Sequence, residues 1–110
     1  MAIKRPTFPK VSEEMKRWSV LLADEMKRWP ETRVGSMFGM ISVYRGDTIF
    51  ALLPDKRGLE LPNAITIKWN GAGKSEREKW QSFVIEGDND LTAAIKQLEE
   101  AYRSAGKREG

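Results

Sequence analysis

The chain has 110 residues and a net charge of +3, from 19 Lys and Arg against 16 Asp and Glu, and it contains neither His nor Cys. This composition excludes Ser-His-Asp triads, Cys-His pairs and metal sites built on imidazole or thiolate, so only carboxylates, lysines and tyrosines remain for catalysis. We therefore predict no catalytic residue, no cofactor and no metal site. The length suits one domain over 1–110, with an ordered core at about 11–106, an extended arm at 1–10 and a tail at 107–110.

The sequence also predicts where the protein is found. No run approaches the roughly 18 apolar residues of a membrane span. The basic start of the chain, Met1 to Pro6, is not followed by the apolar stretch of a secretory signal. The absence of Cys fits a reducing compartment. We expect a cytoplasmic protein without a membrane partner.

A first helix is predicted from Ser12, a good N-cap residue, to Pro30, which ends it. Glu13 and Glu14 place negative charge at the positive end of the helix dipole. Apolar residues recur every three or four positions and form one stripe: Met15, Trp18, Leu22, Met26 and Trp29.

From Val34 the apolar period changes to strict alternation, which predicts strands over 41–44 and 49–53. The tripeptide from Arg45 to Asp47 supplies the glycine of a tight turn between them. Alternation places Ile41 and Val43 opposite Ser42 and Tyr44, and it places Ile49, Ala51 and Leu53 opposite Phe50 and Leu52.

The second half of the chain predicts further strands over 59–61, 64–69 and 82–86. A capping box that begins at Ser75 predicts a short helix through Trp80. The last helix is capped by Asp88 or Asp90, and its apolar stripe is Leu91, Ala94, Ile95, Leu98, Ala101, Tyr102 and Ala105. This order predicts an α+β, two-layer domain: a curved antiparallel sheet of about five strands, with the N- and C-terminal helices packed on one face.

The central segment resembles the TfoX N-terminal domain family and its YgaC-like relatives. The resemblance rests on Met37-Phe38-Gly39, on Val43-Tyr44, on the glycine turn at 45–47 and on Phe50-Ala51-Leu52. The closing helix is also similar to that of YjbR-like domains. The resemblance implies the fold described above and, for function, an association with bacterial competence regulation. Ser36 and Met40 stand where the family often has Arg and Gly. No role of that Arg or that Gly is therefore carried over to this chain.

One candidate surface is basic and aromatic. It comprises Lys68, Trp69, Lys74, Arg77, Lys79 and Trp80. Such residues, exposed together, can stack on bases and neutralise phosphates. Glu76 and Glu78 dilute this charge, and lone tryptophans usually pack in cores.

A second candidate surface lies on the first helix, where Met15, Trp18 and Trp29 could line a ligand pocket or a dimer interface. Residues at helical spacing more commonly form core. The alternatives for the whole protein are therefore three. We expect a non-enzymatic binding or regulatory domain, with a possible homodimer or protein partner. A weak nucleic-acid-binding protein using residues 68–80 is the first alternative, and a small enzyme without His or Cys chemistry is the second.

Overall fold

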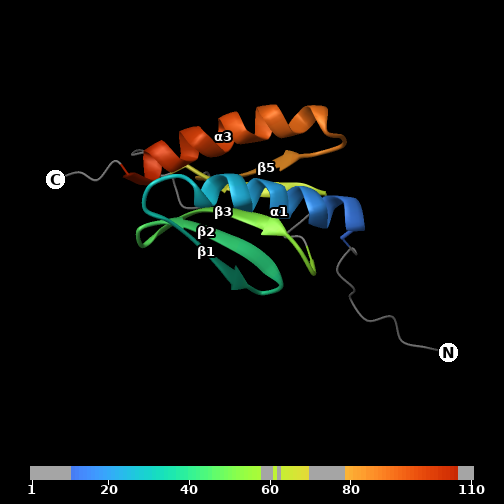
Figure 1. Ribbon diagram of the computed structural model, residues 1–110, viewed down its shortest axis with the longest axis horizontal. Helices are drawn as coiled ribbons and strands as arrows, with labels where there is room; N and C mark the ends of the chain where they lie inside the picture. The colour runs from blue at the N-terminus through green and yellow to red at the C-terminus, as the bar shows by residue number, and fades with distance from the viewer. Residues whose placement is uncertain (1–10, 58–60, 62, 70–78, 107–110) are drawn as a thin grey trace.

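A computed structural model describes residues 11–57, 61, 63–69 and 79–106. Within them the chain forms two long helices and five strands (Figure 1). The elements are α1 (Glu13–Lys27), β1 (Thr32–Met37), β2 (Met40–Arg45), β3 (Thr48–Pro54), β4 (Ala64–Lys68), β5 (Trp80–Val84) and α3 (Asn89–Gly106).

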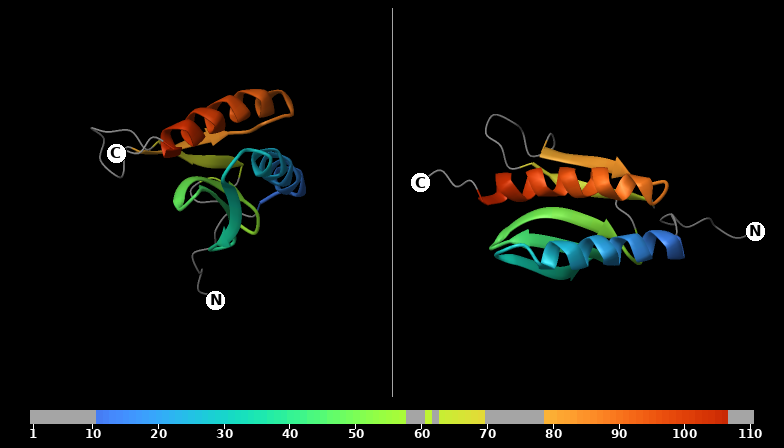
Figure 2. Two further views of the ribbon diagram at one scale, coloured as in Figure 1. Left: turned by 60° about the vertical axis from the view of Figure 1, so that its left-hand side comes forward. Right: turned by 45° about the horizontal axis from the view of Figure 1, so that its top comes forward.

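The five strands form one antiparallel sheet in chain order, β1-β2-β3-β4-β5, so each strand pairs with the next. Both helices lie on the same face of this curved sheet (Figure 2). α1 packs on β1, β2 and β3, while α3 packs mainly on β3 and β4 and also touches α1. The predicted α+β architecture is confirmed.

The core lies between the helices and the sheet. α1 begins as predicted, since the Ser12 hydroxyl accepts a hydrogen bond from the Met15 backbone N–H at 3.0 Å. The helices and the sheet contribute to one continuous apolar cluster because each helix has a single apolar stripe. Its fully buried larger side chains include Met15, Met26, Val43, Phe50, Leu53, Ile65, Ile85 and Leu98.

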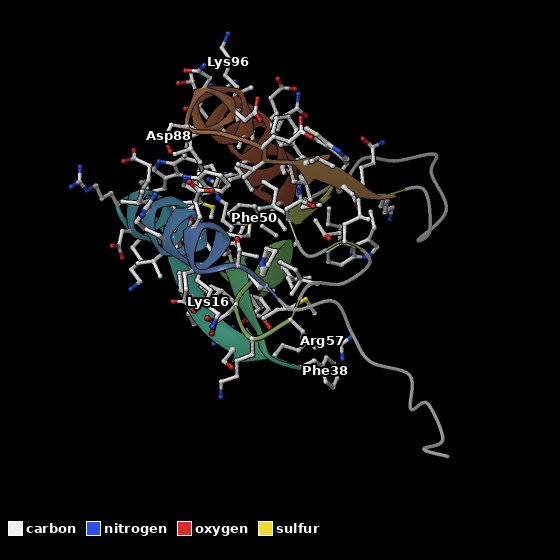
Figure 3. All side chains as sticks on the ribbon, turned by 90° about the vertical axis from the view of Figure 1, so that its right-hand side faces the viewer. Lys16, Phe38, Phe50, Arg57, Asp88 and Lys96 are labelled. Carbon is white, nitrogen blue, oxygen red and sulfur yellow. The ribbon has the colours of Figure 1, made fainter. Side chains whose placement is uncertain are left out.

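The corner at Phe38-Gly39 is the two-residue turn between β1 and β2, because Met37 pairs with Met40. Both turn residues have positive φ, 52° for Phe38 and 78° for Gly39. The Gly39 carbonyl accepts hydrogen bonds from the backbone N–H groups of Lys56 and Arg57, at 2.8 and 3.2 Å. The turn is thereby attached to the segment that follows β3, and Figure 3 shows Phe38 and Arg57 at the same end of the molecule.

The prediction for Phe50 was wrong. Simple alternation places Phe50 opposite Ala51, but both belong to the core. The register between β2 and β3 shifts between Val43 and Tyr44, whose partners are Ala51 and Ile49. Phe50 is therefore the extra residue of a β-bulge. Its ring is fully buried and contacts Tyr102 of α3 edge-on, with 5.8 Å between ring centroids.

The region before α3 differs from the prediction in two ways. Lys79 is helical, but Trp80, the predicted last residue of that helix, is the first residue of β5, paired with Lys68. The remaining residues of that predicted helix, up to 78, and residues 59 and 60 of the predicted strand lie outside the described part of the chain. Asp88 directly precedes α3, but its Oδ1 accepts from Trp18 Nε1, while Asp90 Oδ2 accepts from the Glu86 backbone N–H.

Candidate functional site

The structure separates the predicted basic and aromatic residues. Lys68 ends β4, and Trp69 follows it on the opposite side, half-buried against the core cluster. The Lys79 carbonyl accepts from the Trp69 backbone N–H at 2.7 Å, so Lys79 lies beside the start of β5. Lys74 and Arg77 fall outside the described residues. Of this set, Lys68 and its strand partner Trp80 are the residues that the register places on the sheet face away from the helices.

The predicted surface on α1 is mostly interior. Met15 and Trp18 are buried between α1 and the sheet. The Trp18 indole also donates to Asp88 at 2.8 Å. Trp29 lies beyond the helix end, half-buried, with its ring centroid 5.1 Å from that of Tyr102. Neither Met15 nor Trp18 presents a side chain at the molecular surface.

The sheet face away from the helices, called the open face below, has a central row of side chains. The register aligns Gly35, Ser42, Leu52, Thr66 and Ser82 across all five strands. Three of these, Ser42, Leu52 and Thr66, are buried, whereas Gly35 and Ser82 at the two ends are exposed. The accessible parts of this face therefore lie towards its two lateral edges.

Each lateral edge carries a cation over an aromatic ring. Arg33 and Tyr44 are cross-strand partners on β1 and β2, with the guanidinium carbon 5.0 Å from the ring centroid. Lys68 and Trp80 are partners on β4 and β5, with the ammonium nitrogen 5.5 Å from the ring centroid. Both pairs lie two residues along their strands from the central row and on the same side of it. Because side chains alternate along a strand, both pairs share the open face.

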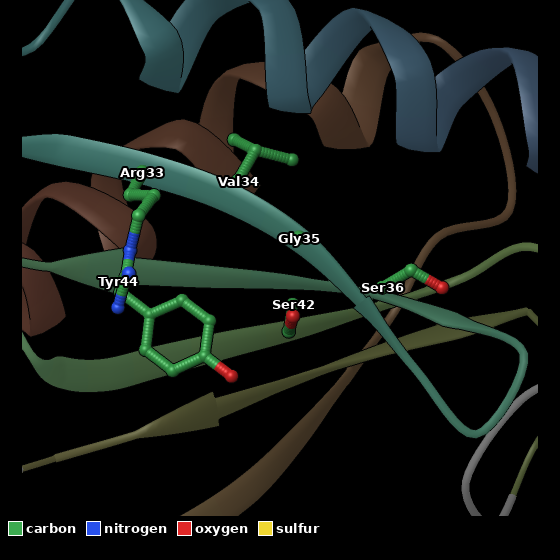
Figure 4. A pocket seen from close by; sticks show the side chains of 6 residues that line it. All are labelled: Arg33, Val34, Gly35, Ser36, Ser42 and Tyr44. Carbon is green, nitrogen blue, oxygen red and sulfur yellow. The ribbon is translucent and has the colours of Figure 1, made fainter.

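A hollow of about 260 Å³ adjoins the first of these pairs. Figure 4 shows that Arg33, Ser42 and Tyr44 lie on one side of the sheet there, while Val34 points towards the helices. The lining residues are Arg33, Val34, Gly35, Ser36, Ser42 and Tyr44. The hollow is thus lined by the Ser42 hydroxyl, the Gly35 backbone and the Tyr44 ring. The Arg33 guanidinium lies at its side.

All the charged residues in the five described strands are basic. None of the five described strands contains Asp or Glu, and the charged residues of the open face within them are Arg33 and Lys68. Within the described part of the chain, the carboxylate paired with Arg33 is that of Asp47, in the turn after β2, at 3.8 Å from the guanidinium. Both side chains of that ion pair are mostly exposed, so the pair is weak. The open face is suited to an anionic ligand.

The described residues also bear on whether the chain has a metal site or a membrane-spanning helix. Within the described ranges, no cluster of three or more acidic side chains has the geometry to hold a metal ion. Neither described helix is both long and apolar enough to cross a membrane.

Sequence reasoning placed Lys68 and Trp80 in one candidate patch but missed Arg33 and Tyr44. Alternation did place Tyr44 and Ser42 together on the polar side of their strand. The missing step was the strand register, since Arg33 lies eleven residues before Tyr44 and Trp80 twelve after Lys68. Only the pairing of the strands brings each cation over its ring.

Comparisons with known proteins add no identity. The chain matches no protein-family model, and no similar protein is found among curated proteins or among solved structures. The TfoX resemblance therefore stays a prediction, which depends on the residues between 37 and 52.

Proposed function

We propose that this chain is a non-enzymatic binding domain that holds single-stranded nucleic acid on its open face. The observation that carries the proposal is the presence of two cation–aromatic pairs, Arg33–Tyr44 and Lys68–Trp80, on one face of one sheet. When each cation turns from its ring to a phosphate, the ring face that it covers becomes a stacking surface for a base. This combination is the one that single-strand binders use.

The spacing of the pairs supports a ligand longer than one nucleotide. Tyr44 on β2 and Trp80 on β5 are three strand steps apart, about 14 Å at the usual strand separation. Sheets with two or three aromatic side chains on an open face bind single-stranded RNA by stacking successive bases. The described strands carry no acidic side chain that would repel the phosphates.

This proposal differs from the sequence-based alternative in its contact residues. The contacts come from four strands, since Arg33 on β1 and Tyr44 on β2 join Lys68 and Trp80, the two ends of the 68–80 segment. Trp69 is not among them because its ring packs on the core side. A regulatory role, which the TfoX resemblance implies, is compatible with this proposal.

Fluorescence anisotropy with short labelled single-stranded DNA and RNA tests the proposal. We expect binding that weakens as salt rises, because the cations displace counterions from phosphates. Tyr44→Leu and Trp80→Leu should each weaken binding roughly 5- to 150-fold, the equivalent of about 1–3 kcal/mol per stacked base. Tyr44→Phe keeps the ring and should retain affinity.

Matched cations elsewhere provide the control. Lys68→Gln should weaken binding, whereas Lys96→Gln should not, because Lys96 is exposed on α3 and extends away from the sheet (Figure 3). Arg33→Gln is compared in the same way with Arg103→Gln, also on α3. Absence of binding at low salt, or equal losses in Lys68→Gln and Lys96→Gln, would refute the proposal.

A further inference from the structure

The hollow beside Tyr44 contains a buried hydroxyl group that lacks a hydrogen-bond partner among the described residues. Ser42 is 1% exposed, and its Oγ makes no hydrogen bond to them. Leaving a buried polar group unpaired is unfavourable, so such groups in folded proteins call for an explanation. Ser42 lines the hollow, and a ligand there that displaces the groups covering its Oγ would supply the missing partner.

Gly35 maintains the space next to this hydroxyl. Gly35 is the cross-strand partner of Ser42 on β1. A Cβ at position 35 would lie 3.3 Å from Ser42 Oγ and 3.9 Å from Cε1 of Tyr44. Any side chain here would therefore occupy the part of the hollow between the hydroxyl and the ring. The backbone does not require glycine here, because the described residues with positive φ are elsewhere.

Arg33 supplies the charged side of the hollow. Its guanidinium lies over the Tyr44 ring, and its ion pair with Asp47 is long, at 3.8 Å, and solvent-exposed. An exposed pair of this kind contributes little and can be replaced by a stronger partner. Phosphate is such a partner, because a guanidinium can donate two parallel hydrogen bonds to it.

We infer that this hollow is a nucleotide subsite, where one nucleotide places its base against Tyr44, a polar base edge at Ser42 and its phosphate at Arg33. The inference rests on the proposed function and deepens it, because it makes one position of the bound strand selective. Stacking alone is tolerant of sequence. The Ser42 hydroxyl can donate to or accept from a base edge, and it distinguishes a base that pairs with it from one that does not.

The decisive variant is Ser42→Ala, with Ser19→Ala as its control. Ser19, on α1, is the other described residue whose buried hydroxyl has no partner. Removing either unpaired hydroxyl should leave the melting temperature unchanged or raise it. Ser42→Ala should also weaken binding of a nucleoside monophosphate, titrated as AMP, CMP, GMP and UMP, by about five- to tenfold for the preferred base. Ser19→Ala should not change that affinity.

A second variant tests the space itself. Gly35→Ala should weaken binding of the preferred nucleotide, and titration of the wild type should shift the backbone amide resonances of Gly35 and Ser42. Unchanged affinity in both Ser42→Ala and Gly35→Ala, with a wild type that binds, would overturn the inference.

The two proposals can fail separately. If oligonucleotides bind and respond to Tyr44→Leu and Trp80→Leu, but Ser42→Ala and Gly35→Ala have no effect, the function stands and the subsite is refuted. If no oligonucleotide binds at low salt, the proposed function is refuted. In that case the subsite proposal stands only if the wild type still binds a mononucleotide and Ser42→Ala weakens that binding. A wild type that binds neither oligonucleotides nor mononucleotides refutes both the function and the subsite.

Discussion

Trp18 and Asp88 join the two helices across 70 residues of sequence. The indole Nε1 of Trp18, on α1, donates to Oδ1 of Asp88, immediately before α3, at 2.8 Å. Trp18 is 3% exposed, so its ring lies in the core, while its N–H reaches Asp88 near the surface. The hydrogen bond to Asp88 thus lets the Trp18 ring be buried with its indole N–H satisfied.

Asp88→Ala should lower the free energy of unfolding by about 1–3 kcal/mol, because it leaves a buried N–H unpaired. Trp18→Phe in the Asp88→Ala background should cost less than Trp18→Phe alone, since the hydrogen bond is already absent. Urea unfolding followed by circular dichroism measures both. Asp24→Ala serves as control, because Asp24 forms an exposed pair with Lys27 and should change stability by less than about 0.5 kcal/mol.

The turn at Phe38 holds an aromatic residue where a hairpin favours asparagine. Phe38 has φ of 52° and is 75% exposed, so its strained backbone is not offset by burial of its ring. Two-residue turns with positive φ at both positions prefer Asn-Gly. Phe38→Asn should therefore raise the free energy of unfolding by about 0.5–1 kcal/mol. A lower urea midpoint for Phe38→Asn would show that the ring makes a stabilising contact.

Two glycines with positive φ should respond differently to alanine. At Gly46, with φ of 61°, an alanine Cβ would meet no atom of the described residues within 4 Å, so Gly46→Ala adds backbone strain alone, about 1 kcal/mol. Gly39→Ala adds the same strain and also brings Cβ to 3.1 Å from Arg57 Cγ. Thermal unfolding should rank Gly39→Ala below Gly46→Ala. Equal melting temperatures would mean that the Arg57 side chain moves aside at no cost.

Tyr102 connects α3 to both the end of α1 and the sheet. Its hydroxyl donates to the Pro30 carbonyl at 2.6 Å, and its ring contacts Trp29 and Phe50. Tyr102→Phe removes only the hydrogen bond and should cost about 0.5–1.5 kcal/mol. Tyr102→Leu also removes the aromatic contacts and the contact with the cation above the ring, Arg45, and should cost more. Chemical denaturation of the two variants separates these contributions, and equal losses would contradict the assignment.

Local signals predicted the helices and turns correctly where a residue type is strongly preferred at one structural position, such as a helix N-cap or a turn. Ser12 predicted the start of α1 because a hydroxyl before a helix satisfies a backbone N–H, and this N-cap is confirmed. Gly46 predicted a turn, and its positive φ is confirmed. The apolar stripe of the last helix also matches the buried positions of α3, Ala94, Leu98, Ala101 and Ala105.

Errors arose where a neighbour in space overrides the local pattern. Phe50 violates alternation because the bulge between β2 and β3 turns it towards Tyr102. The helix predicted through Trp80 ends one residue earlier: Lys79 is helical, but Trp80 pairs with Lys68 as the first residue of β5, because strand pairing satisfies its backbone groups. Asp88 lies where a cap is expected, but its carboxylate accepts from Trp18.

The sequence by itself determined the α+β class, the two amphipathic helices, the hairpin at 40–54 and the absence of imidazole and thiol chemistry, since composition and periodicity act within a few residues. The tertiary structure alone decided which side chains share the open face. Arg33 reaches Tyr44, and Lys68 reaches Trp80, only through the register of paired strands. Register depends on how each whole strand pairs with its neighbour and on burial of one face of the sheet against the helices, and neither can be read from any short segment.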